Sequence, residues 1–165
     1  MQIIPLLSKE FDTEAAISRK MLSRIPDDKY DWKPHDKSMS IRQLAAHLAE
    51  IPGWVTLTFN TSELDFSKGD YKSPVVNNTK EVLDVFEQSV AEGKRSLENA
   101  KEEDLWLMWT MRNGDQIYST NTKYEVIRMS FAQIIHHRAQ LGVFLRLLNV
   151  PIPGSYGPSA DEMGF

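Results

Sequence analysis

The segment from Thr122 to Val150, TKYEVIRMSFAQIIHHRAQLGVFLRLLNV, predicts the longest helix of the chain and decides the fold. Thr122 followed three residues later by Glu125 forms a capping box, a start signal for a helix. Pro151 and Pro153 end the helix, because proline disfavours helical geometry in the residue before it. One face carries residues at spacings of three and four, namely Val126, Ser130, Gln133, His137, Leu141, Phe144 and Leu148.

Two polar side chains, Gln133 and His137, lie one turn apart on this predicted inward face. A buried imidazole needs a hydrogen-bond partner or a metal, since leaving it unpaired costs roughly 1–3 kcal/mol. The pair is therefore the first candidate for a functional site.

Three more amphipathic helices precede this one. Their predicted N-caps are Ser8, Ser40 and Asn78, and they end near Arg24, Phe59 and Ala100. Pro52-Gly53 falls inside the second helix, whose apolar stripe resumes beyond it, so we expect a kink there.

The remaining segments connect these helices. Residues 60–77 are polar and predict a long surface connection between the second and third helices. Asn113-Gly114 predicts a hairpin of residues 107–112 and 115–119, which needs support from the helices, with Trp106 and Trp109 as candidate contacts. Together the patterns predict an all-α protein, a four-helix bundle with a small β-hairpin before the last helix.

Length and composition limit the class of protein. At 165 residues the chain is predicted to form a single domain over residues 1–165. The net charge of −4 disfavours nucleic-acid binding, and the lack of cysteine excludes disulfides and zinc-thiolate sites. The N-terminus does not resemble a signal peptide, and no apolar run has the roughly 18 residues of a membrane span. We expect a soluble, cytoplasmic protein with no membrane partner.

His47 is a second inward-facing histidine and lies on a different helix from His137. Facing helices of a bundle can project such residues into one core site, and neutral imidazole is a common metal ligand. The alternative is that each histidine only hydrogen-bonds a neighbouring group. His136 is rotated by about 100° from His137, which favours a supporting or interface role, and His35 is expected in an exposed loop.

The motifs HHRAQLGVFLRLLNVPIPGSYGPSADE at 136–162 and AAHLAEIPGW at 45–54 resemble the DinB/YfiT-like family of small bacterial metalloproteins. The resemblance extends to SRIPDDKYDWKPHDKSMSIRQLAAHLAE and WTMRNGDQIYS, and so covers most of the chain. It implies a four-helix bundle, frequently a homodimer, with a divalent metal held by three histidines. His47 and His137 correspond to two of these ligands.

The third family ligand falls on Gln133, which is a departure from the pattern. A glutamine carbonyl oxygen is a weaker ligand than imidazole for zinc or nickel, so Gln133 is expected to be a weak third ligand or to hold a water on the metal. The expected cofactor is a divalent metal, zinc, nickel or manganese.

Family members with assigned activity look like metal-dependent thiol transferases acting in detoxification. The resemblance therefore implies a small-molecule substrate and a low-molecular-weight thiol, which must come from outside because the chain has no cysteine. The alternative is a non-catalytic, ligand-binding or dimeric stress-response bundle that has lost the metal. Arg128, Arg138 and Lys123 are interpreted as surface residues without a catalytic role.

Overall fold

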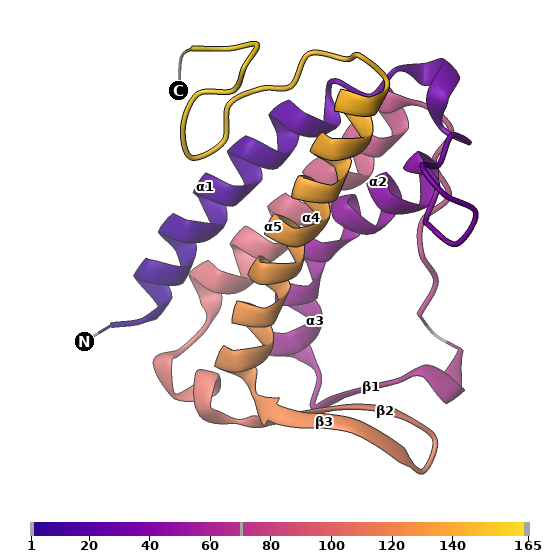
Figure 1. The fold of residues 1–165 in the computed structure, drawn as a ribbon. Helices are drawn as coiled ribbons and strands as arrows, with labels where there is room; N and C mark the ends of the chain where they lie inside the picture. Colours follow the sequence, from indigo (N-terminus) through magenta and orange to yellow (C-terminus); the bar gives the residue numbers. More distant parts are fainter. Residues whose placement is uncertain (1, 70, 164–165) are drawn as a thin grey trace.

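The computed structural model describes residues 2–69 and 71–163 and is mostly helical, with a small three-stranded sheet (Figure 1). The α-helices are α1 (Ile4–Leu22), α2 (Ile41–Glu50), α3 (Trp54–Asn60), α4 (Thr79–Asn99) and α5 (Lys123–Leu147). The strands are β1 (Glu63–Asp65), β2 (Met108–Asn113) and β3 (Gln116–Thr122). Within the described part of the chain, no helix is long and apolar enough to cross a membrane.

Side-chain caps explain where three of the helices begin. Ser40, Asn78 and Thr122 each accept a hydrogen bond from the backbone N–H three residues later, as their sequences predict. The prediction for α1 is wrong, because this helix already begins at Ile4. Ser8 lies inside it, and its hydroxyl donates to the Ile4 carbonyl oxygen at 3.0 Å.

The kink expected at Pro52-Gly53 is a one-turn 3₁₀ helix, Ile51–Gly53, which separates α2 from α3. Helix α4 passes close to this interruption at Gly93. A Cβ atom at position 93 would lie 2.6 Å from the Pro52 carbonyl oxygen and 2.8 Å from the Phe11 ring. Only glycine allows this close approach of the helices.

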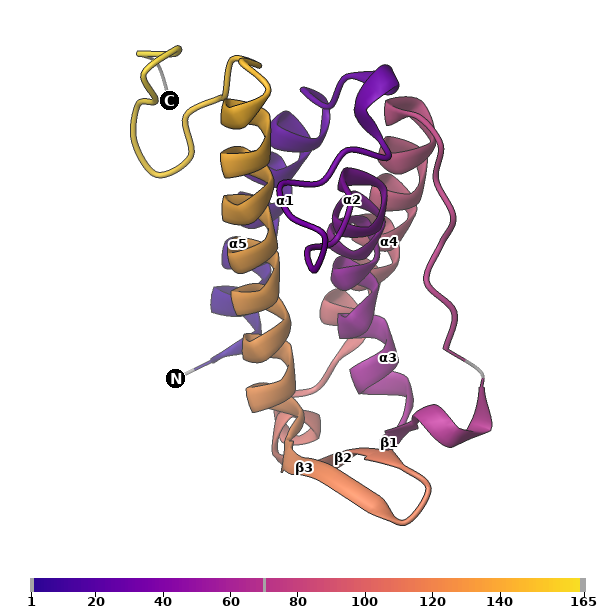
Figure 2. The ribbon, with the colours of Figure 1, turned by 45° about the vertical axis from the view of Figure 1, so that its right-hand side comes forward.

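Helices α1, α4 and α5 and the interrupted rod of α2 and α3 pack around a shared core (Figures 1 and 2). Helix α5 contacts both α1 and α2, and α4 contacts the same two helices from the other side. The apolar residues of the predicted inward faces are buried or partly buried in this core, whereas Gln133 is exposed. Fully buried residues of the core include Phe11, Leu22, Ile41, Leu44, Leu48, Phe86, Phe131 and Leu141, of which Phe131 lies outside the predicted inward faces. This burial is the main stabilising contribution to the fold.

The sheet contains a strand that the sequence patterns did not reveal. Strand β1 comes from the connection between α3 and α4 and pairs in parallel with β2, which pairs antiparallel with β3. The turn residues between β2 and β3 are Gly114 and Asp115 rather than Asn113 and Gly114, and Gly114 has φ 58°. The Asp65 carboxylate joins β1 to this turn by accepting the Gly114 N–H at 2.9 Å.

Of the two tryptophans expected to support the strands, only Trp109 is buried. It is 1% exposed, and its indole N–H donates to the Thr61 hydroxyl at 2.9 Å. Trp106 is 55% exposed. The sheet is therefore attached to the end of α3 through Trp109 as well as by direct continuation into α5.

A buried ion pair connects α1 to α5. Arg138 donates to the Glu14 carboxylate at 2.6 Å and to the Ser18 hydroxyl at 3.2 Å, and Arg138 is only 3% exposed. The Tyr156 hydroxyl accepts from Arg138 at 2.7 Å and donates to Glu14 at 2.8 Å. This network holds the segment after α5 against the helices.

Replacing Glu14 with Gln should destabilise the protein by about 3–5 kcal/mol, because it leaves the buried Arg138 guanidinium without its counter-charge. The double variant Glu14→Leu, Arg138→Met should lose much less, because neither charge remains buried. Urea unfolding followed by circular dichroism measures both free energies. Equal losses in the single and double variants would contradict this account of the pair.

Candidate functional site

His47 on α2 and His137 on α5 come together inside the helical body. Their ring centroids lie 4.7 Å apart, with the ring planes at 72°. The His47 side chain is 24% exposed and His137 is 9% exposed, so the pair is partly shielded but reachable from solvent. The structure thus brings together the two histidines that the sequence placed on separate inward faces.

A hydrogen-bond network fixes the orientation of His47. Its Nδ1 atom lies 2.7 Å from Glu50 Oε1, one turn further along α2. The same oxygen accepts from the Tyr71 hydroxyl and from the Ser73 hydroxyl, the latter at 3.3 Å. The Glu50 carboxylate can only accept, so His47 donates from Nδ1, and in the neutral form of the ring Nε2 is the nitrogen with the lone pair.

The Tyr71 phenol is held as a neutral donor in this network. Burial and the hydrogen bond to Glu50 raise the pKa of Tyr71 to about 12. The ring lies edge-on to Trp54, at 6.2 Å between centroids, and to Phe66, at 5.8 Å. The connection between α3 and α4 therefore takes part in orienting a histidine on α2.

His137 is oriented in the same manner from its own helix. Its Nδ1 lies 2.9 Å from the side-chain carbonyl oxygen of Gln140, so Nε2 is the ring nitrogen that remains for a ligand. Burial lowers the pKa of His137 below its usual value, while the bond to Gln140 raises it and the neighbouring His47 and His136 rings lower it. The neutral imidazole, the form that binds metals, is thereby favoured.

Gln133 lies on the wall of a small cavity that His47 also lines. The cavity has a volume of about 230 Å³ and an otherwise largely apolar lining of Ile51, Trp54, Met111, Met129 and Ser130. Gln133 is exposed rather than buried, in contrast to the sequence expectation. Within the described residues its amide has no hydrogen-bond partner, so the amide is available to a ligand or a water.

The arrangement of the two histidines fits a metal ion in one respect. Metal-bound histidines usually donate their second ring N–H to a carboxylate or carbonyl oxygen, which is the arrangement of both His47 and His137. The donor set is nevertheless small: residues 2–69 and 71–163 contain no cluster of three His, Cys, Asp or Glu side chains that could hold a metal ion. Any third protein ligand would have to be a neutral group such as Gln133.

Two further hollows border the histidines. One, of about 490 Å³, lies beside His47 and is walled by Met39, Tyr71 and Val75. The other, of about 230 Å³, lies beside His137 and shares Met39 with the first. The histidine pair is thus surrounded by space for a small molecule with apolar groups.

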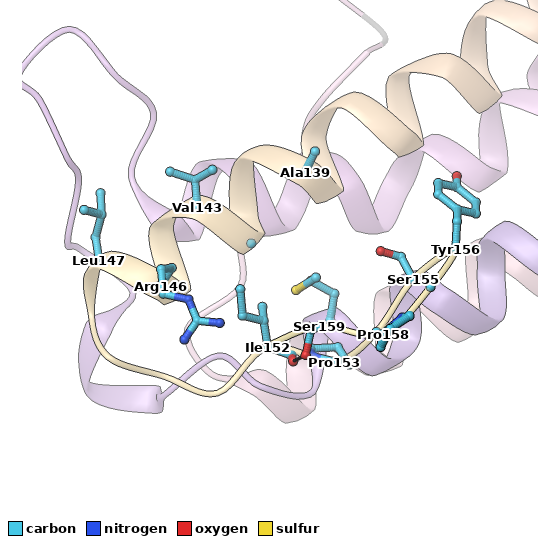
Figure 3. Close-up of a pocket in the computed structure, with 14 residues that line it drawn as sticks. Ala139, Val143, Arg146, Leu147, Ile152, Pro153, Ser155, Tyr156, Pro158 and Ser159 are labelled. Carbon is cyan, nitrogen blue, oxygen red and sulfur yellow. Dashed lines mark hydrogen bonds between the residues drawn. The ribbon is translucent and has the colours of Figure 1, made fainter. Parts of the chain in front are cut away.

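A separate cavity of about 490 Å³ lies between α1, α5 and the segment that follows α5 (Figure 3). Figure 3 shows Ala139, Val143 and Leu147 in succession along α5, with Ile152 and Tyr156 on the following segment. None of its lining residues is a histidine. Since these positions lie on a different face of α5 from His137, this cavity is distinct from the histidine site.

Sequence reasoning missed the groups that orient the histidines. Glu50 and Gln140 each lie three residues after a histidine, and this spacing could have identified both. Tyr71 had no such signal, because it comes from a segment interpreted as a simple connection. Arg138 and Lys123 were interpreted as surface residues and are both buried, at 3% and 6% exposure.

The remaining predictions for this region concern exposed residues. His136 is exposed, with its ring centroid 4.9 Å from that of His137, and His35 is exposed in its loop. Arg128 is partly exposed and pairs with Glu10. None of these residues lines the cavity shared by His47 and Gln133.

The family model of the DinB family matches residues 3–164, and the chain belongs to this family. A curated relative, the uncharacterised protein YrdA of Bacillus subtilis, is 22% identical over 162 residues, which cover 93% of this chain and 88% of YrdA.

Two solved structures share the fold. The DinB-like protein YjoA of Bacillus subtilis is 17% identical, with a TM-score of 0.68 over 89% of this chain and 96% of YjoA. A DinB-like protein from Bacillus cereus is 16% identical, with a TM-score of 0.71 over 91% of this chain and 95% of the other. At these identities the likeness establishes the fold, and the chemistry has to be argued from the site.

The metal-free protein should lose stability as the pH falls, partly through His137. Its native pKa is lowered, so the unfolded state binds more protons below about pH 6.5. This contribution is present above that pH and is lost as the pH falls through the native pKa. Urea unfolding between pH 5 and 8 should show a shallower pH dependence in His137→Asn than in the parent protein. An identical slope in both would contradict it.

Proposed function

We propose that the protein binds a divalent metal through His47 and His137, with Gln133 as a weak third ligand or as the anchor of a metal-bound water. The single observation that carries the proposal is the adjacency of the two rings, each with Nδ1 engaged by an oxygen. Zinc, nickel and manganese are the candidate ions. The proposal also takes the helical body to be the four-helix bundle that the family resemblance implies.

The proposed activity is transfer to or from a small cellular thiol, in detoxification or stress in the cytoplasm. A divalent cation bound here would supply thiol activation, since coordination deprotonates a thiol and the thiolate is the nucleophile. The chain has no cysteine, so the thiol is a co-substrate. This part of the proposal comes from the family resemblance.

The residues around the site have defined tasks in this proposal. Glu50 and Gln140 orient the two rings, and Tyr71 holds Glu50 in place. Trp54 and Met129 form an apolar wall that would exclude water and contact apolar parts of a substrate. The larger hollow beside His47 would take the rest of the substrate.

A second candidate function is the binding of a small ligand without metal or catalysis. The observation that favours it is the neutral Gln133 beside the two histidines, together with the absence, within the described residues, of any cluster of three acidic, histidine or cysteine side chains that could hold a metal. Metal content distinguishes the two candidates.

Protein purified without nickel affinity, stripped and titrated with zinc, nickel and manganese, should bind about one metal per chain. His47→Ala should abolish this binding while leaving the helical circular dichroism spectrum intact, since His47 is partly exposed and holds no core contact comparable to Leu48. Elemental analysis and calorimetry make the measurement.

Gln133→His provides the reciprocal variant and should tighten metal binding, because imidazole is a stronger ligand than an amide oxygen. Unchanged or weaker affinity would show that residue 133 does not face the metal. If the parent protein binds no metal, the metal proposal is wrong and the second candidate function is favoured.

We also propose a homodimer that uses the outer side of α5. Val143 and Leu147 are 59% and 58% exposed, one turn apart, and continue the line of exposed Ala139. Adjacent exposed apolar side chains often mark an interface.

Light scattering should therefore give twice the chain mass, and Val143→Glu should shift the protein toward the monomer by burying a charge in the interface. Val75→Glu, at an exposed position on another segment, is the matched control. A monomeric parent protein would overturn the dimer proposal.

A further inference from the structure

A polar cavity lies far from the histidines, where α3 and α4 end and α5 begins. Its volume is about 330 Å³, and Lys123, Arg95 and Asp104 are the charged residues that line it. Lys123 and His137 are separated by about 21 Å along the axis of α5, at a rise of 1.5 Å per residue. In Figure 1 this region lies at the end of the helices next to the sheet.

Lys123 is an unusual residue for such a position because it is only 6% exposed. Its ammonium group donates to the Phe59 carbonyl oxygen at 2.8 Å, which uses one of three donors. No aspartate or glutamate in the described part of the chain forms an ion pair with it. Burial lowers the pKa of Lys123, opposed by the Asp104 carboxylate. A buried ammonium without a paired anion is costly, which suggests that an anion from outside completes the site.

A second cation lines the same cavity. The guanidinium of Arg95 makes no ion pair and no hydrogen bond with any residue the structure describes, although its backbone carbonyl accepts from Asn99. The amides of Asn60 and Asn99 add neutral polar groups to the lining. Two cations without a paired anion in the described residues, one buried and one exposed, therefore line the same open cavity.

The remaining charges determine which anion fits. Asp104 is the only acidic lining residue, and one of its carboxylate oxygens accepts from the backbone N–H of Lys101 at 3.1 Å. The C-terminal ends of α3 and α4 and the N-terminal end of α5 all lie here, so the helix dipoles add no net positive potential to the cavity. The side chains thus leave one net positive charge, which matches a monoanion better than a phosphate dianion.

We propose that this cavity binds the carboxylate of a small monoanionic molecule between Lys123 and Arg95. The non-polar part of the molecule packs against Phe59 and Leu107, which also line the cavity. The volume lies at the lower end of the range for small-molecule sites, so the ligand is small. This site is independent of the metal proposed between His47 and His137.

Calorimetric titration with phenylacetate, and with phenylacetamide as its neutral analogue, tests the proposal. Phenylacetate should bind saturably. Phenylacetamide should bind at least about 10-fold more weakly, because the neutral amide loses the charge-assisted hydrogen bonds of the carboxylate. Lys123→Met should weaken phenylacetate binding by about 10-fold or more by the same reasoning. Amide chemical shifts should change around residues 95 and 123 and not around His47.

Arg95→Gln is the second variant and protects the test against a folding defect in Lys123→Met, since Arg95 is exposed. It should also weaken phenylacetate binding. Lys80→Gln, which removes an exposed lysine of α4, is the matched control and should leave affinity unchanged. Equal binding of the acid and the amide, no saturable binding, or affinity unaffected by Arg95→Gln would overturn the proposal. Tighter binding of inorganic phosphate than of phenylacetate would overturn the choice of a monocarboxylate.

Discussion

The buried contact between Arg138 and Glu14 is the constraint on which the arrangement of α5 depends. A guanidinium that is 3% exposed and bonded to a carboxylate, a serine hydroxyl and a tyrosine hydroxyl allows little rotation of its helix. His137 is the preceding residue, so the same restraint directs it toward α2 rather than α1. An ion pair on one face of the helix thus sets the position of the imidazole on the neighbouring face, about 100° away.

Hydrogen bonds to side-chain oxygens also fix the two histidine rings of the candidate site. Neither histidine is held by packing alone, because each ring nitrogen Nδ1 is bonded to an oxygen from its own helix. Glu50 in turn accepts from Tyr71, so the loop between α3 and α4 contributes to the order of the site. Gln133 is the exception, since it is exposed and its amide has no hydrogen-bond partner among the described residues.

Much of the fold could be predicted from the sequence, because the caps and apolar spacings are local signals. The helix that starts after Thr122, the interruption near Pro52 and the juxtaposition of His47 with His137 all follow from such signals. The parallel strand β1 could not be predicted in this way, because its three residues pair with a strand more than 40 positions away. The same applies to the burial of Arg138 and Lys123, whose partners Glu14 and Phe59 are distant in sequence.

The network around Glu14 also has a consequence for the order of events during synthesis. Glu14 is translated 142 residues before its hydrogen-bond partner Tyr156 and 124 residues before Arg138. Helix α1 can form locally as soon as it emerges, but its carboxylate has no buried partner until nearly all of the described chain is available. Docking of α1 onto α5 is therefore expected to be a late step, and a nascent chain would keep Glu14 in contact with water until then.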